Sequence, residues 1–261
     1  MKKLMVSAMA VLTFLMTSNA YAGYIPADGY VGAQIAPNFR STDGAVGVSL
    51  DDENITFTLP FAFTFFGHEY TQGWISGNGL LGFDLGNIDG PDPDNADREG
   101  DAYCCDATYI KNAPTNTIVA GWFDLYGDVY VQTSGQIGAR EFTVTWNGKE
   151  FGSDASNRFQ VILREFSTDI EFQYAQLNAD QNPADPVHYA TAGGIKGGED
   201  SVGLAFIDFQ EEAHLGKTGL LIRYDPQAAS EVPAPGSVVL TGLGLAALAL
   251  LRRKTRRARL L

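Results

Sequence analysis

Short runs of aromatic and β-branched residues, separated by clusters of Gly, Asn, Asp and Ser, recur along the middle of this chain. In the segment Phe142-Thr143-Val144-Thr145-Trp146 the large side chains alternate with threonine, which is the pattern of a half-buried strand. Between residues 23 and 230, no window of twelve or more residues keeps an apolar stripe with a period of 3.6 residues. The sequence therefore predicts an all-β protein built as a single antiparallel β-sandwich.

About ten strands are expected from this pattern, joined by short turns. They are predicted at Ile55 to Leu59, Phe61 to Phe65, Gly79 to Phe83, Thr117 to Trp122, Asp128 to Gln132, Glu141 to Trp146, Arg158 to Phe166, Asp169 to Tyr174, Ser201 to Ile207 and Gly219 to Tyr224. No internal repeat is visible, and the stretch is long enough for one domain with a sizeable core.

Three segments have the composition of hairpin turns. Asn78-Gly79 lies between apolar runs, and the other two are Thr133 to Gln136 and Ser167 to Asp169. Phe166 and Ile170 flank the last of these turns, so we expect both side chains to help fix the register of its two strands.

The first 22 residues have the organisation of a secretory signal peptide. Two lysines precede an apolar stretch from Leu4 to about Met16, and Ala20 and Ala22 supply the small residues of a signal peptidase site. We therefore expect an exported protein whose sandwich domain spans residues 23–230.

Residues 231–261 combine a proline-rich break, a short apolar run and a basic end. The break is formed by Val232, Pro233, Ala234, Pro235 and Gly236, and the apolar run follows at 237–251. As a helix rising about 1.5 Å per residue, that run covers roughly two-thirds of a 30 Å hydrocarbon core. The basic residues after it favour the cytoplasmic side. This predicts a short transmembrane helix with backbone accessible to a protease just outside the membrane; a plain C-terminal anchor is the alternative.

This order of elements resembles the PEP-CTERM sorting signal of Gram-negative bacteria, which the membrane protease exosortase recognises. Ala234 stands where the family's usual motif has glutamate, whereas the Gly-Leu-Gly-Leu-Ala segment from Gly242 to Ala246 and the closing arginines fit the family. The resemblance implies that exosortase processes an inner-membrane precursor, and that the product is associated with exopolysaccharide or biofilm at the cell surface.

The exported part of the chain is strongly acidic. The full sequence has 18 basic and 31 acidic residues. Without the two lysines of the signal peptide and the six basic residues of the tail, 10 basic residues remain, so the net charge is about −21. Such a surface argues against nucleic acid and anionic lipid as partners and suits solubility, divalent cations or cationic surfaces.

Several segments between Val48 and Ala205 resemble the nidogen-like sandwich of extracellular proteins. They include Leu59 to Gly67, Trp74 to Phe83 and Ile118 to Leu125, followed by the predicted strands from Phe142 to Tyr174. The resemblance implies the fold, and a fold alone does not name a ligand.

An acidic loop from Asp89 to Asp101 has distinctive chemistry. Its carboxylates are interleaved with Gly, Pro and Asn, and oxygen ligands of this kind suit calcium, which takes six to eight of them. Asp92, Asp94 and Asp97 are the candidate ligands, although their spacing differs from the EF-hand pattern. A flexible acidic loop without metal is the alternative.

Cys104 and Cys105 are the two cysteines of the chain. Their Cα atoms are about 3.8 Å apart, which is below the usual range for a disulfide, so a bond between them would be a strained vicinal ring. Pairing with another chain and free thiols remain open. A zinc site is disfavoured because CxxC spacing is absent.

Motifs of catalysis are scarce, and we expect a protein that is not an enzyme. His68, His188 and His214 are scattered singly, and the common hydrolase, metalloprotease and nucleotide-binding motifs are absent. The preferred hypothesis is an exported surface or matrix protein. The alternatives are a calcium-dependent carbohydrate-binding module and a glycan-acting hydrolase with two carboxylates.

Aromatic residues bear on the choice between these hypotheses. Trp122 and Trp146 are interpreted as core residues rather than sugar platforms. Tyr126, Tyr130 and Tyr189 are candidates for lining a sugar site.

Overall fold

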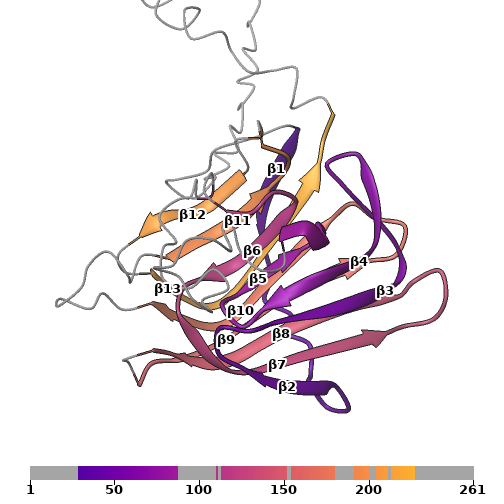
Figure 1. The fold of residues 1–261 in the computed structure, drawn as a ribbon. Helices are drawn as coiled ribbons and strands as arrows, with labels where there is room; N and C mark the ends of the chain where they lie inside the picture. The colour runs from indigo at the N-terminus through magenta and orange to yellow at the C-terminus, as the bar shows by residue number, and fades with distance from the viewer. Residues whose placement is uncertain are drawn as a thin grey trace, which may run out of the picture.

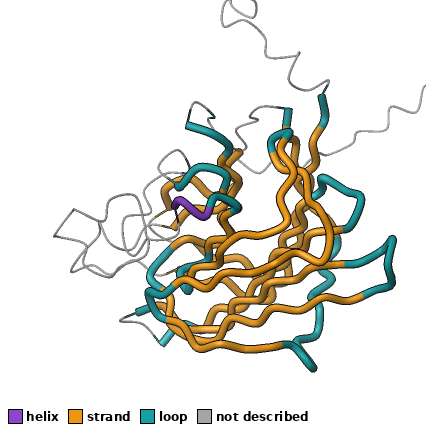
Figure 2. The backbone as a smooth tube through the Cα atoms, turned by 45° about the vertical axis from the view of Figure 1, so that its right-hand side comes forward, coloured by secondary structure: helices purple, strands orange, loops and turns teal. Residues whose placement is uncertain are grey.

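The computed structural model describes residues 29–87, 110, 113–151, 154–179, 191–199, 201, 204–210 and 213–226. These residues form two antiparallel sheets that face each other (Figures 1 and 2), which confirms the predicted all-β sandwich. They include one short 3₁₀ turn, η1 (Leu85–Asn87), and no helix long and apolar enough to cross a membrane. The expected signal peptide and the expected transmembrane helix of the tail both lie outside the described residues.

Each sheet has an order that departs from the sequence. The seven-stranded sheet runs β1-β13-β10-β9-β8-β7-β2 and the six-stranded sheet runs β12-β11-β6-β5-β4-β3. The strands are β1 (Tyr30–Ile35), β2 (Val46–Leu50), β3 (Asn54–Phe65), β4 (His68–Ser76), β5 (Leu80–Gly82), β6 (Thr117–Trp122), β7 (Leu125–Ser134), β8 (Glu141–Glu150), β9 (Ser156–Arg164), β10 (Ile170–Ala179), β11 (Thr191–Lys196), β12 (Leu204–Gln210) and β13 (Ala213–Tyr224).

The sequence pattern located most of these strands but not all of them. The expected strands from Ile55 to Leu59 and from Phe61 to Phe65 are one strand, β3, which continues through Pro60. Proline is tolerated there because β3 is an edge strand and its register against β4 shifts between Thr58 and Phe63. β1, β2, β4 and β11 were not predicted, because glycine interrupts the apolar pattern in each of them.

The core between the sheets is largely aromatic. Every second residue of β3 points into it, so Phe57, Leu59, Phe61, Phe63 and Phe65 are all buried. From the other sheet, Trp146 stacks on Phe159 with ring centroids 5.4 Å apart and donates its indole N–H to Ser76 O at 2.8 Å. Tyr174 likewise donates its hydroxyl to Ala120 O at 2.5 Å. The polar ends of these large side chains are therefore satisfied inside the core.

A second apolar layer covers the outer face of the six-stranded sheet. Trp74, Leu80, Val119 and Trp122 are buried there against Ile110 and Ala113, which lie outside the strands. The outer face of this sheet is therefore not a free surface at these positions. Trp122 and Trp146 are both core residues, as predicted.

Residues 36–45, here called the strap, cross the outer face of the seven-stranded sheet. They must do so because β1 and β2, which they connect, are the two opposite edges of that sheet. Side-chain amides on the sheet bind the strap's backbone. Gln173 of β10 accepts from Asn38 N at 2.7 Å, and Gln160 of β9 both accepts from Arg40 N and donates to Arg40 O at 2.8 Å. Two glutamines that lie opposite each other on neighbouring strands thus supply hydrogen bonds to the backbone of the strap.

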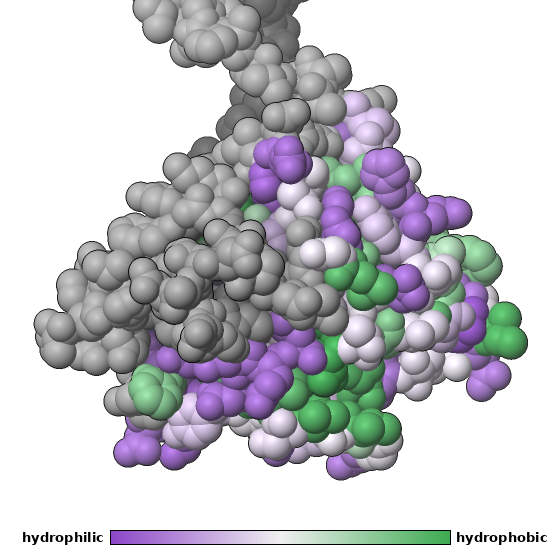
Figure 3. Space-filling view, viewed as in Figure 1, coloured by the Kyte–Doolittle hydropathy of each residue, from purple (hydrophilic) through white to green (hydrophobic). Residues whose placement is uncertain are grey.

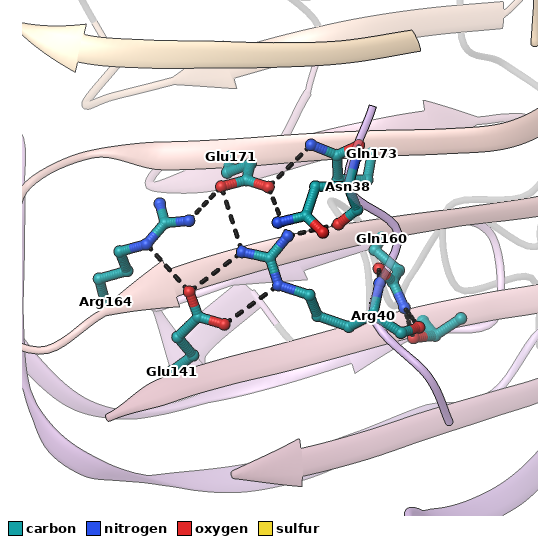
Figure 4. Close-up of polar contacts among 8 residues, drawn as sticks. Asn38, Arg40, Glu141, Gln160, Arg164, Glu171 and Gln173 are labelled. Carbon is teal, nitrogen blue, oxygen red and sulfur yellow. Dashed lines mark hydrogen bonds and ion pairs between the residues drawn. The ribbon is translucent and has the colours of Figure 1, made fainter. Parts of the chain in front are cut away.

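Arg40 anchors the middle of the strap through a network of four charges (Figure 4). Its guanidinium binds Glu141 of β8 at 3.0 Å and Glu171 of β10 at 2.8 Å. Arg164 of β9 lies beside it and binds the same two carboxylates, Glu141 at 3.0 Å and Glu171 at a short distance. Gln173 also donates to Glu171, at 2.7 Å. The two positive charges of the arginines therefore balance the two negative charges of the glutamates. This balance allows the network to be half-buried.

The β7–β8 and β9–β10 hairpins are joined at their tips. Glu165 accepts from Gly138 N at 2.7 Å and from the Arg140 guanidinium at 2.6 Å. The expected role of Phe166 in fixing register was wrong: its side chain is 87% exposed and its φ is +58°, because it belongs to the turn itself. Ile170, by contrast, is buried opposite Leu163, as expected.

Candidate functional site

One end of the sandwich is organised around the buried side chain of Asn78, in the turn between β4 and β5. Its amide nitrogen donates to Asp52 Oδ1 at 3.1 Å, and its amide oxygen accepts from Leu125 N at 2.7 Å. Asp52 lies in the β2–β3 turn, and Leu125 begins β7 directly after Asp124. Asn78 therefore ties two connections from distant parts of the chain to one point.

Two glycines allow the close approach of these connections. A Cβ at Gly77 would lie 2.0 Å from Asp51 O, and a Cβ at Gly79 would lie 2.1 Å from Gly121 O. Gly79 also has a φ of +82°, which side chains disfavour. The Gly-Asn-Gly turn, which the sequence marks as a hairpin signal, thus also packs against the acidic β2–β3 turn on one side and the end of β6 on the other.

Three carboxylates meet where these connections converge. One oxygen from each of Asp51, Asp52 and Asp124 lies within 4.8 Å of the others. Burial first, and then the neighbouring charges of Asp52 and Glu53, raise the pKa of Asp51. Negative charge is therefore concentrated at this end of the sandwich, and a cation placed there would relieve the repulsion.

A surface hollow of about 470 Å³ adjoins the carboxylates, with Asp51 and Glu53 in its wall. Tyr126, at the start of β7, and Phe151, just after β8, also line it and are 39% and 57% exposed. The backbone N–H of Phe151 donates to the backbone oxygen of Asp124 at 3.0 Å. This bond holds the segment that carries Phe151 close to the three carboxylates. In Figure 3, hydrophilic residues gather at the end of the molecule where Figure 1 draws the start of β7.

The chemistry of this end differs from that of the network under the strap. In the network each glutamate binds two guanidinium groups, so its charge is matched and its role is structural. At the hollow, carboxylates stand beside exposed aromatic rings. Three close carboxylate oxygens supply part of the six to eight ligands that calcium takes, and rings beside acids also suit an organic cation.

Several predicted site residues lie outside the described residues, namely Ala20, Ala22, Asp92, Asp94, Asp97, Cys104, Cys105, His188, Tyr189 and Val232 to Gly236. Among the described candidates, His68 is exposed on β4 and Tyr130 is half-buried. His214 lies in β13. Tyr126 is the one predicted sugar-site residue that the structure places in the hollow.

The acidic group formed by Asp51, Asp52 and Asp124 was not predicted from the sequence. Two signals were present: the run Asp51-Asp52-Glu53 directly before the aromatic strand β3, and an aspartate two residues after the end of the buried strand β6. Neither signal says that the two segments meet. Their proximity depends on β2 and β3 belonging to different sheets, which the strand pattern does not reveal.

A family model described as NIDO related matches residues 29–218. The match covers β1 to β12 and the part of β13 up to Thr218, and it includes the region from Val48 to Ala205 that resembles nidogen-like proteins. No curated protein and no solved structure matches the chain.

Proposed function

The chain belongs to the NIDO-related family, and we propose that it is a non-enzymatic protein of the cell surface or extracellular matrix. In this proposal the chain is exported by its N-terminal signal and held in the inner membrane by residues 231–261. Exosortase then cuts near Pro235 and releases the sandwich domain, which associates with exopolysaccharide.

The observation that carries the proposal is the order of segments along the chain. The NIDO-related match ends at residue 218, and the segment resembling a sorting signal begins thirteen residues later, at 231. An extracellular domain directly before a protease-accessible break is the arrangement that a sorted surface protein requires. The acidity of the exported part supports an extracellular, solvated location.

The experiment is to measure the intact mass and the cell fraction of the mature protein in its own host, with and without exosortase. We expect a chain ending near Pro235 outside the cell, and retention in the membrane when exosortase is deleted. A chain that keeps Leu261 in the membrane fraction of both strains would contradict processing and make the tail a plain anchor. A Pro235→Ala variant tests whether the break itself is recognised, with Pro226→Ala as the matched control upstream.

A second candidate function is calcium-dependent carbohydrate binding. Asp51, Asp52 and Asp124 favour it because their oxygens already lie within 4.8 Å of one another. Asp92, Asp94 and Asp97 are proposed as a further calcium group. Retention on exopolysaccharide with and without a chelator tests this candidate: loss of retention that calcium restores is expected, and unchanged retention would contradict it.

A further inference from the structure

We propose that the hollow between the β2–β3 turn and the start of β7 binds amine-bearing sugar units of a polysaccharide directly, without a bridging metal. The inference rests on the proposed association with exopolysaccharide and adds the class of sugar and the residues that recognise it. Asp51 and Glu53 receive the ammonium group, while Tyr126 and Phe151 contact the ring.

The dimensions and walls of the hollow suit one or two sugar units. Its volume of about 470 Å³ lies within the usual range of small-molecule sites, and its wall includes both acids and both aromatic residues. A pyranose ring has an apolar face of C–H groups and a rim of polar groups. It therefore requires an aromatic surface beside hydrogen-bond acceptors, and the hollow provides both.

The charge of the hollow selects the kind of sugar. Asp51 and Glu53 line it, and Asp52 and Asp124 stand next to Asp51. The exposed rings of Tyr126 and Phe151 add the negative faces of their π systems, which attract an ammonium group. An anionic sugar would be repelled and a neutral one would gain nothing from the carboxylates. A sugar with a free amine is attracted both by the carboxylates and by the faces of the aromatic rings.

The backbone segments that carry the acids and rings are also tied together, which limits the entropy lost on binding. Asn78 fixes Asp52 to the start of β7, and the N–H of Asp51 donates to Glu53 Oε2 at 2.9 Å. The backbone of Phe151 is bound to Asp124 O. The fold thus brings the acids of the β2–β3 turn to one site with a ring from the start of β7 and a ring from just after β8.

The test measures binding of a glucosamine tetramer to the purified protein by calorimetry at low salt, with the N-acetylated tetramer as the comparison. We expect the free-amine tetramer to bind at least about tenfold more tightly, and excess calcium to weaken binding by competition. An Asp51→Asn/Glu53→Gln double variant should weaken binding at least about tenfold. The control is Asp43→Asn/Glu69→Gln, which removes the same charge from exposed positions on the strap and at the start of β4 and should change the affinity less than about twofold.

Three results with the sugar tetramers would overturn the inference. They are equal affinity for the two tetramers, binding that requires calcium, and binding that the double variant leaves unchanged. Because Phe151 is exposed and outside the core, Phe151→Ala provides a second variant whose fold is not at risk; it should weaken binding of the tetramer. A polylysine peptide that binds more tightly than the tetramer would also overturn it, in favour of a protein partner. If the sugar-binding inference is overturned, the proposal of export and exosortase processing still stands, because that proposal is tested separately by the mass and the cell fraction of the protein.

Discussion

Glu171 is the residue through which the charged network under the strap can be tested most sharply. Its side chain is only 5% exposed and accepts hydrogen bonds from Arg40, Arg164 and Gln173. In a Glu171→Gln variant the side chain keeps its size but loses its charge. Two arginines then share the single carboxylate of Glu141, and the excess positive charge stays half-buried.

The expected loss follows from the contacts. Each hydrogen bond to a charged group contributes roughly 1.5–3 kcal/mol, and removing one partner of a buried pair costs about 3–5 kcal/mol. Arg164 is 31% exposed and Arg40 is 15% exposed, so water compensates in part. We therefore expect Glu171→Gln to lower the free energy of unfolding by about 3 kcal/mol, which is a fall in Tm of roughly 6–12 °C for a domain of this size.

The assay is urea denaturation followed by tryptophan fluorescence, with Asp169→Asn as the matched control. Asp169 also pairs with an arginine, Arg223, but that arginine is 59% exposed, so the control should cost at most about 1 kcal/mol. A double-mutant cycle with Arg40→Gln should give a coupling energy of about 1–3 kcal/mol. If Glu171→Gln cost no more than Asp169→Asn, the strap would not depend on this network and the reasoning would be refuted.

Four further predictions concern single residues. The Arg140 guanidinium lowers the pKa of Glu165 to about 2 from its usual 4.5. The stability that Glu165 contributes is therefore complete above about pH 5 and is lost as the pH falls toward 2. A Glu165→Gln variant should show a flatter dependence of Tm on pH between these values. Asn78→Ala should lower the free energy of unfolding by about 2 kcal/mol, measured by urea denaturation, because Leu125 N loses its buried acceptor. Asp51→Asn should raise Tm at pH 7 and low salt, since burial and two neighbouring acids oppose its ionisation, and the gain should shrink in high salt; a fall in Tm would contradict the repulsion. Trp146→Ala should lower the free energy of unfolding by about 3–5 kcal/mol, because it leaves a cavity in the core. Ile137 is 86% exposed in a turn, so Ile137→Ala should change the free energy of unfolding by less than about 0.5 kcal/mol in the same denaturation experiment.

The class of the fold could be read from the sequence because strand alternation is a local property. Alternate residues of a strand point to opposite faces whatever the rest of the chain does, so the aromatic positions of β3 and β8 were identifiable as core from their spacing alone. The hairpin at Asn78-Gly79 was equally local, since its turn depends on the conformation of two residues. Trp146 could also be identified as a core residue from the local pattern, because large apolar residues alternate with threonine in its strand.

Tertiary structure decided what the local pattern does not contain. The chain passes from β2 in one sheet to β3 in the other, and this change of sheet brings Asp51 and Asp52 to Asp124, far away along the sequence. The strap crosses the seven-stranded sheet only because its two neighbouring strands occupy opposite edges, and Arg40 meets Glu141 and Glu171 for the same reason. Local preference sets which residues form strands. The order in which the strands pair depends on burying the whole core at once, so the acidic hollow emerged only from the assembled sandwich.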